Sequence, residues 1–211
     1  MSERVTATEK TGPRFARETP DVRRRLLIEA AIRCLAEGGI AAFTIDRISR
    51  EANVSRGLIN HHFDGIAGLL TAVYEDMTRS MYKERRDVLR EGTAEERLLA
   101  IIDTMFRPPM FAKSNLRAWL ALWGEVATNP AMKVAHRRSY DAYRGALKET
   151  LEEIAKARGM KVDAQGLATT CIALIDGLWI EWCLDATVIN RESARAAVHD
   201  VIEARLGKVG R

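Results

Sequence analysis

The sequence predicts an all-α protein, with an N-terminal three-helix helix-turn-helix domain followed by a larger helical domain and about nine helices in all. Three observations lead to this prediction. Apolar residues recur at helical spacing along most of the chain, no stretch alternates with the two-residue period of a strand, and polar cap residues stand just before the apolar stripes. The 211 residues, of which 47% are hydrophobic, are enough to bury a sizeable core.

Residues 1–18 are expected to form a flexible basic arm. They lack apolar periodicity and carry cations at Arg4, Lys10, Arg14 and Arg17. Such an arm can reach into the minor groove of DNA, and a solvated tail is the alternative. The segment also lacks the apolar core of a signal peptide, so we expect a cytoplasmic protein.

The first helix is expected to begin at Thr19-Pro20, a cap residue followed by proline in the first turn, and to end at Gly38-Gly39. Its buried stripe is Leu27, Ala31, Cys34 and Leu35. Three arginines at positions 23–25 crowd the first turn, where the helix dipole disfavours cations. A partner phosphate nearby explains this crowding, and an ordinary solvated face is the alternative.

Residues 43–63 predict two short helices joined by a tight turn. Thr44 is expected to cap the first helix and Ser55 the second. Asn53 stands where a left-handed residue closes the first helix and turns the chain. The side chains expected to face inward are Ile45, Ile48, Ala52, Leu58, Ile59 and Phe63.

The outer side of the second short helix carries polar groups that suit DNA. Arg56, Asn60 and His61 can meet base edges and phosphates, and Gly57 lets a phosphate approach the backbone. This arrangement is typical of a helix-turn-helix with a recognition helix, and a generic helical hairpin is the alternative. The predicted DNA-binding residues are Thr44, Arg47, Ser55, Arg56, Gly57, Asn60, His61 and His62.

A long helix is predicted over residues 66–90, and at 1.5 Å per residue it is roughly 37 Å long. Its apolar side carries Leu70, Val73, Met77, Met81 and Leu89. Gly92 ends it, and Thr93 with Glu96 forms a capping box for the next helix.

Four more helices are predicted towards the end of the chain. Pro108-Pro109 breaks the preceding helix, and Ser114 is expected to cap the first of the four. Its inner face is Leu116, Trp119, Leu120 and Trp123. Asn129-Pro130 begins a helix that runs to Gly159, and the last two helices cover residues 163–185 and 191–206.

The helix-turn-helix residues resemble the DNA-binding domain of the TetR family of bacterial repressors. The resemblance is carried by Thr44, Ile48, Ala52, Val54, Ser55, Gly57, Ile59, Phe63 and the following Gly68-Leu69-Leu70. It implies a homodimeric repressor that binds palindromic operator DNA and responds to a small-molecule effector. Two departures stand out: Asn60 replaces the usual tyrosine, and Ile66 replaces a lysine that holds a phosphate.

The domain over residues 66–211 resembles a narrower group, the choline-responsive BetI repressors. Residues 117–123, followed by Asn129-Pro130, and residues 173–179 carry this resemblance. It implies that residues 66–211 bind an effector and dimerise, whereas residues 19–65 bind DNA. Effectors change freely among such domains, so a hydrophobic or aromatic effector is the alternative to choline or a related quaternary amine.

Three of the four tryptophans lie in the two segments that resemble the choline-responsive group, and Trp182 lies three residues beyond the second segment. Tryptophan faces are good partners for a quaternary ammonium, and a nearby carboxylate from Glu125, Asp176 or Glu181 can add a counter-charge. Tryptophans at helical spacing are also common in ordinary cores. The predicted ligand pocket is Met105, Trp119, Trp123, Asp176, Trp179 and Trp182.

The resemblance places the dimer interface on the last two helices. Their apolar residues cover more of each helix than one packing partner needs, although a monomer core is the alternative. Two such helices from each subunit can close a four-helix bundle around a two-fold axis. The predicted interface is Cys171, Leu174, Ile175, Leu178, Ala194, Ala197, Val198, Val201 and Ile202.

Enzyme, metal-binding and membrane classes are not expected. The sequence has no glycine-rich phosphate loop, no nucleophile elbow and no zinc-type cysteine pair. His61 and His62 point about 100° apart on a helix, which suits a shared metal poorly. The most apolar run, residues 171–182, is interrupted by Asp176 and Glu181. No cofactor is expected, and a helical protein-binding adaptor is a further alternative that leaves the exposed polar set unexplained.

Overall fold

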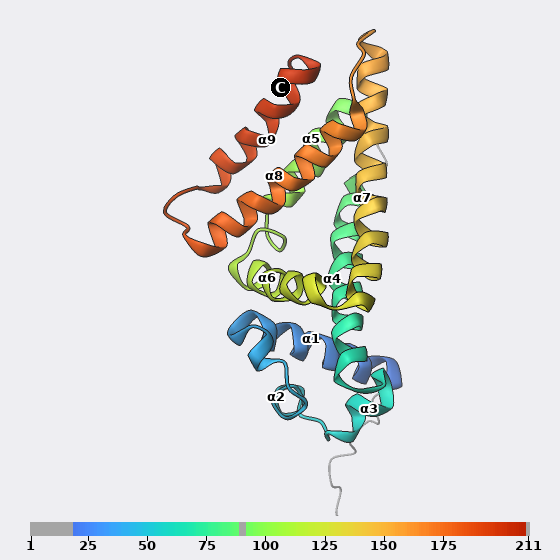
Figure 1. The fold of residues 1–211 in the computed structure, drawn as a ribbon, viewed down its shortest axis with the longest axis vertical. Coiled ribbons are helices and arrows are strands. Elements are labelled where there is room, and N and C mark those ends of the chain that lie inside the picture. The colour runs from blue at the N-terminus through green and yellow to red at the C-terminus, as the bar shows by residue number, and fades with distance from the viewer. Residues whose placement is uncertain (1–18, 89–91, 210–211) are drawn as a thin grey trace, which may run out of the picture.

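The computed structural model describes residues 19–88 and 92–209; the side chains of residues 84–88 lie outside this description, as do the predicted arm, Leu89 and Arg90. The described residues form nine α-helices, one short 3-10 helix and no strand, which confirms the predicted all-α class (Figure 1). The helices are α1 (Pro20–Gly38), α2 (Ile45–Glu51), α3 (Gly57–Phe63), α4 (Gly65–Val88), α5 (Ala94–Met105), α6 (Lys113–Thr128), α7 (Pro130–Ala157), α8 (Ala164–Leu184) and α9 (Arg191–Leu206), with the 3-10 helix at Ile40–Ala42.

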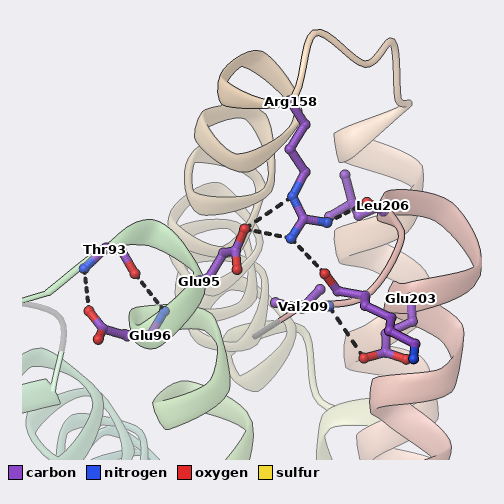
Figure 2. Close-up of polar contacts among 8 residues, drawn as sticks. Thr93, Glu95, Glu96, Arg158, Glu203, Leu206 and Val209 are labelled. Atoms are coloured by element: carbon purple, nitrogen blue, oxygen red, sulfur yellow. Dashed lines mark hydrogen bonds and ion pairs between the residues drawn. The ribbon is translucent and has the colours of Figure 1, made fainter. Parts of the chain in front are cut away.

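Most helices begin at the cap residues that the sequence predicts. Thr19 and Thr44 each accept a hydrogen bond from the backbone N–H three residues on, at 3.4 and 3.3 Å. Asn53 follows α2 with a φ of 53°, in the left-handed region that ends the helix. Thr93 and Glu96 form the reciprocal capping box of α5 (Figure 2). The predicted caps therefore fix where α1, α2 and α5 begin.

The predicted cap at Ser55 is wrong. α3 begins at Gly57, Arg56 occupies the cap position, and no side chain caps the helix there. The N–H groups of Leu58 and Ile59 donate instead to the carbonyls of Ser55 and Arg56, at 3.1 and 3.3 Å. A tight first turn of backbone hydrogen bonds thus takes the place of the side-chain cap.

Two details predicted for α6 are also wrong. The helix begins one residue before Ser114, because the Leu116 N–H donates to the Ala112 carbonyl at 2.9 Å. Leu120 is 36% exposed, whereas Leu122 is fully buried. α6 packs against α1 as well as against α7 and α8, so its buried face is wider than one stripe and is turned towards Leu122.

The last helix of the N-terminal three, α3, is joined to α4 by a sharp turn at Asp64, whose φ is 56°. α4 then passes so close to α3 that a Cβ on Gly68 would lie 1.6 Å from the carbonyl oxygen of Phe63. Only glycine fits at this position. The close approach holds α3 on the beginning of α4, so a tilt of α4 carries α3 with it.

Figure 1 shows α4 and α7 as two long helices side by side, with α6 lying across their lower part next to α1. Among the described helices, α1 packs most extensively against α6. The α1–α3 unit is therefore linked to the rest of the chain through the continuous chain into α4, through the packing of α1 and α3 on α4, and through the α1–α6 contact.

Arg158, just after α7, fastens the end of α9 to the rest of the chain (Figure 2). Its guanidinium donates to the Glu95 carboxylate at 2.5 and 3.0 Å and to the carbonyls of Leu206 and Lys208 at 2.5 and 2.7 Å. The guanidinium thus joins α5, α7 and the C-terminal end of α9, and charge-assisted hydrogen bonds of this kind are the strong ones. These hydrogen bonds fix the position of the end of α9 relative to α5 and α7.

Candidate functional site

The exposed side of α3 carries Arg56, Gly57, Asn60 and His61, while Ile59 is fully buried. Thr44, Arg47 and Ser55 are exposed as well, and His62 is half-buried. All eight predicted DNA-binding residues thus lie on α2, on α3 or just before these helices, and none of them is buried. A large partner with a flat or grooved surface can therefore contact them.

Gly57 has no intramolecular reason to be glycine. A Cβ at this position would meet nothing within 4 Å, and the residue lies in the first turn of a helix. Glycine there costs the helix roughly 1 kcal/mol relative to alanine. A close approach by an outside group, such as a phosphate against the backbone, would account for it.

Two of the predicted DNA-binding arginines are paired with carboxylates. Nε of Arg56 lies 3.0 Å from Oδ1 of Asp46, and Nη2 of Arg47 donates to Oε2 of Glu37 at 2.8 Å. All four side chains are well exposed, so each pair is worth little in stability and can be exchanged for another anion. The pairs hold Arg56 beside α2 and Arg47 beside α1, and they leave both side chains exposed.

The arginine-rich first turn of α1 lies against the end of α3. Cζ of Arg24 is 4.9 Å from the centroid of the Phe63 ring. Partial burial lowers the pKa of His62, and the charges of His61, Arg23 and Arg24 lower it further. The charges at the beginning of α1 and the end of α3 therefore form one cationic region.

A cluster of five aromatic side chains from three helices lies between α4, α6 and α7; we call Tyr74, Trp119, Trp123, His136 and Tyr140 the aromatic cluster. Tyr74 meets Trp119 edge-on with ring centroids 5.7 Å apart, and Trp119 lies 5.8 Å from Trp123. The rings of His136 and Tyr140 are 4.0 Å apart. Tyr74 and Trp119 are almost completely buried, so the rings fill the space between the helices themselves.

Asp176 of α8 adds a carboxylate to the aromatic cluster. The Tyr140 hydroxyl donates to Oδ2 of Asp176 at 3.1 Å. Desolvation by burial raises the pKa of Asp176 to about 7, although the hydrogen bond from Tyr140 works against this shift. A carboxylate that is short of solvent and bonded to one member of an aromatic cluster is a favourable place for an organic cation.

The structure divides the six predicted pocket residues. Trp119, Trp123 and Asp176 belong to the aromatic cluster, whereas the Trp179 indole donates to the Met105 carbonyl at 3.0 Å in the core. Trp182 stacks on Phe111 with ring centroids 4.3 Å apart. Trp179 and Trp182 therefore have partners of their own, from α5 and the segment after it.

Sequence reasoning missed three members of the cluster, Tyr74, His136 and Tyr140. A signal for two of them was present, because His136, Tyr140 and Tyr143 are spaced four and three residues apart and so share one face of α7. Tyr74 looks like any other member of the apolar stripe of α4. Only the packing of α4 on α7 brings its hydroxyl to His136.

The predicted dimer residues fall into two groups. Five are buried within the chain: Cys171, Ile175, Ala194, Val198 and Ile202. Four are half-buried and lie along the outer side of α8 and α9: Leu174, Leu178, Ala197 and Val201. The five buried residues are core residues because α8 packs on α7 and α9 packs on α8 and α5. Only the second group is free to meet another chain.

The outer side of α8 and α9 is hollowed at one end. A groove of about 510 Å³ lies between the beginning of α8 and the end of α9, lined by apolar residues such as Leu167 and Val201 and by the charged residues Lys161, Asp163 and Arg205. By length and composition alone α8 could cross a membrane, yet core helices of soluble proteins pass the same test, and 33% of its most apolar window is buried in the chain. The uncovered portion of α8 is thus unusually apolar for a surface.

Two family models match the chain. The model described as "Bacterial regulatory proteins, tetR family" matches residues 27–73, and the model described as "BetI-type transcriptional repressor, C-terminal" matches residues 94–207. Together they cover the helix-turn-helix, the cluster residues on α6 and α7, and the outer side of α8 and α9, whereas Tyr74 lies one residue beyond the first match.

Similar proteins agree with these matches. The HTH-type transcriptional regulators BetI of Escherichia coli O17:K52:H18 and Vibrio vulnificus are 32% and 30% identical, over 88% and 89% of this chain and 94% of each protein. A transcriptional regulator from Pseudomonas aeruginosa PAO1 superposes with a TM-score of 0.81 and 34% identity, over 90% of this chain and 93% of that one. A regulator from Saccharomonospora viridis, solved in complex with choline, superposes with a TM-score of 0.80 and 25% identity, over 90% and 100%.

Proposed function

Because this chain belongs to the TetR family of bacterial regulatory proteins and carries a BetI-type C-terminal domain, we propose that it binds a palindromic operator as a homodimer and is released by a quaternary amine. It is a transcriptional regulator rather than an enzyme, as its named relatives are. The observation that carries the DNA-binding proposal is the exposed set on α3, with a glycine that nothing inside the chain requires.

In this proposal α3 enters the major groove, and the two α3 helices of the dimer lie one helical turn of DNA apart, roughly 34–36 Å. Arg56 exchanges Asp46 for a guanine or a phosphate, and Asn60 meets an adenine edge or a phosphate. The Thr44 hydroxyl accepts its cap hydrogen bond and still has a proton to donate to a phosphate. His61 and His62 contact the DNA backbone.

Arg23 and Arg24 are proposed to supply the phosphate contact that the family's usual lysine makes. Ile66 stands at the position of that lysine and packs against the core, so it offers no charge. The two arginines lie close to His62, at the end of α3. This role also explains why cations crowd the beginning of α1, where the helix dipole opposes them.

Arg56→Ala and Asn60→Ala are each expected to weaken operator binding by about 1–3 kcal/mol, the usual cost of losing one good base contact. Each variant should also relax the sequence preference at one base pair. Fluorescence anisotropy with the promoter of the protein's own operon, and with single-base variants of it, measures both effects. Wild-type affinity in both variants would show that α3 is not the recognition helix.

Gly57→Ala is expected to separate DNA binding from stability. The added methyl meets nothing inside the chain, so the free energy of unfolding should be unchanged or rise by up to about 1 kcal/mol. Operator affinity should fall several-fold, because the methyl keeps a phosphate from the backbone. Thermal unfolding and anisotropy on the same preparation test this prediction. Unchanged operator affinity would show that no phosphate approaches the backbone at Gly57.

The effector is proposed to be choline or a related quaternary amine held by the aromatic cluster and Asp176. The supporting observations are the ring faces of Trp119 and Trp123, the desolvated carboxylate, and the choline complex of the similar Saccharomonospora viridis regulator. A wholly hydrophobic effector would leave the largely desolvated carboxylate with the Tyr140 hydroxyl but without a counter-charge, which is costly. The rings fill the site in this structure, so a ligand must displace at least one of them.

The dimer is proposed to form through the outer side of α8 and α9. Leu174, Leu178, Ala197 and Val201 supply apolar area that nothing in the chain covers completely. A four-helix bundle from two copies would bury it around a two-fold axis. The other five predicted residues are buried beneath this face and do not form part of it: Cys171, Ile175, Ala194, Val198 and Ile202.

A further inference from the structure

α4 and α7 are joined by a hydrogen bond between Tyr74 and His136. The Tyr74 hydroxyl lies 2.9 Å from Nδ1 of His136, and Tyr74 is fully buried. Burial lowers the pKa of His136, which favours the neutral imidazole, and a neutral imidazole has one ring nitrogen that can accept a hydrogen bond. The proposed recognition helix, α3, is joined to the beginning of α4. A hydrogen bond that restrains α4 therefore also restrains the position of α3.

Both partners of this bond also touch the proposed effector site. Tyr74 meets Trp119 edge-on at 5.7 Å, and the His136 ring lies 4.0 Å from that of Tyr140, which hydrogen-bonds to Asp176. The cluster is closely packed, so a ligand that enters must move neighbouring rings. Tyr74 and His136 are the two cluster members that are hydrogen-bonded across the interface between α4 and α7, which we call the α4–α7 seam.

A groove of about 490 Å³ runs along the outside of the same seam. It is lined by Thr71 and Thr78, one turn before and after Tyr74, and by Ala135 and Ser139, beside and one turn after His136. Helical spacing therefore places the Tyr74–His136 bond between the groove and the cluster.

We infer that the Tyr74–His136 hydrogen bond holds α4 in the DNA-binding position and that the effector acts by breaking it. The inference rests on the proposed effector site. In this scheme the chain has two packings: the bond is made in the operator-binding packing and broken in the effector-bound one. An effector can shift such an equilibrium only through its different affinity for the two packings.

Tyr74→Phe tests the inference, because it removes the hydroxyl and keeps the ring. Loss of one hydrogen bond should favour the effector-bound packing roughly three- to tenfold. Choline should therefore bind more tightly by up to this factor, and the choline concentration for half-release of the operator should fall accordingly. Operator affinity without choline should be unchanged or lower. A hydroxyl with a purely structural role would weaken both ligands instead.

Two further variants sharpen the test. His136→Leu should shift the release midpoint in the same direction, and the double variant with Tyr74→Phe should shift it no further, since both remove one bond. Tyr82→Phe is the matched control, because the Tyr82 hydroxyl donates to the Ser139 carbonyl on the same seam, two turns along α4 from Tyr74. Its midpoint should stay at the wild-type value.

The measurements are tryptophan fluorescence for choline binding and anisotropy for operator release. If the wild type neither binds choline nor releases DNA, the proposed effector fails and the inference falls with it. If the wild type responds but Tyr74→Phe raises the midpoint or leaves it unchanged, the inference alone is overturned, and the α1–α6 contact is left to transmit the signal. An equal shift in Tyr82→Phe overturns it too, because the whole seam and not this bond would then set the position of α4.

Discussion

Val201→Glu is expected to convert the proposed dimer into monomers and to lower operator affinity by at least about a hundredfold. Val201 is half-buried on the outer side of α9, beside the groove that separates it from α8. In the two-fold bundle two glutamates would lie in an apolar interface, and an unpaired buried carboxylate costs several kcal/mol. One recognition helix alone makes about half of the operator contacts, so loss of the dimer weakens binding strongly.

Sedimentation equilibrium measures the dimer, and anisotropy measures operator binding. Ala196→Glu is a matched control, because Ala196 is exposed on α9 and lies roughly 140° around the helix from Val201. Val198→Glu is a poor test, since Val198 is fully buried and its substitution would unfold the chain rather than separate the subunits of a dimer. A Val201→Glu protein that remains dimeric would place the interface on another surface.

Local chemistry explains what the sequence predicts well. A hydroxyl or carboxylate at a helix beginning acts within three residues, so Thr44 and Thr93 could be identified as caps without knowledge of the fold. Asn53 is another local case, because the left-handed conformation depends on the residue itself. Ser55 fails because backbone hydrogen bonds compete for the same N–H groups in a tight turn.

Spacing in the sequence does not show which apolar side of a helix packs inside the chain and which side remains accessible. Val198 and Val201 are three residues apart on α9 and both apolar, yet one is core and the other half-exposed. Their difference arises from where α9 packs on α8 and α5, which the sequence of α9 does not contain. The same holds for the aromatic cluster, whose rings and carboxylate come from four helices. Trp179 is close in sequence to Asp176 and Trp182, which predicts a place in the pocket, but its indole donates a hydrogen bond to the Met105 carbonyl of α5.

The proposed cation site also predicts a pH dependence. The carboxyl of Asp176 has a pKa of about 7 in this packing, because burial opposes its charge. A quaternary amine binds the ionised form, so below pH 7 its binding must release a proton and becomes weaker. Choline affinity is expected to rise about tenfold between pH 6 and pH 8. Burial shifts the pKa of His136 downward and that of Tyr140 upward, so both shifts move these groups away from the middle of this window.

Asp176→Asn is expected to lower choline affinity by about a few hundredfold at pH 8 and to remove the pH dependence. A charge pair about 4–5 Å apart at an effective dielectric constant near 20 is worth about 3–4 kcal/mol, which is the basis of this magnitude. Asparagine keeps the shape and an oxygen that can accept from Tyr140. Titration of choline by tryptophan fluorescence at several pH values measures both effects. Glu181→Gln is the control, because Glu181 is an exposed carboxylate on the same helix.

The same substitution should stabilise the ligand-free protein at alkaline pH, which separates loss of binding from loss of fold. The pKa of Asp176 is raised from 3.8 in a free side chain to about 7 in the folded chain. Between these values the unfolded chain has lost the proton that the folded chain still holds, so stability falls as pH rises from about 4 to 7. Asparagine has no such proton. Asp176→Asn should therefore unfold at a higher temperature than the wild type at pH 8, and a lower melting temperature would contradict the desolvated carboxylate without a counter-charge on which the cation site depends.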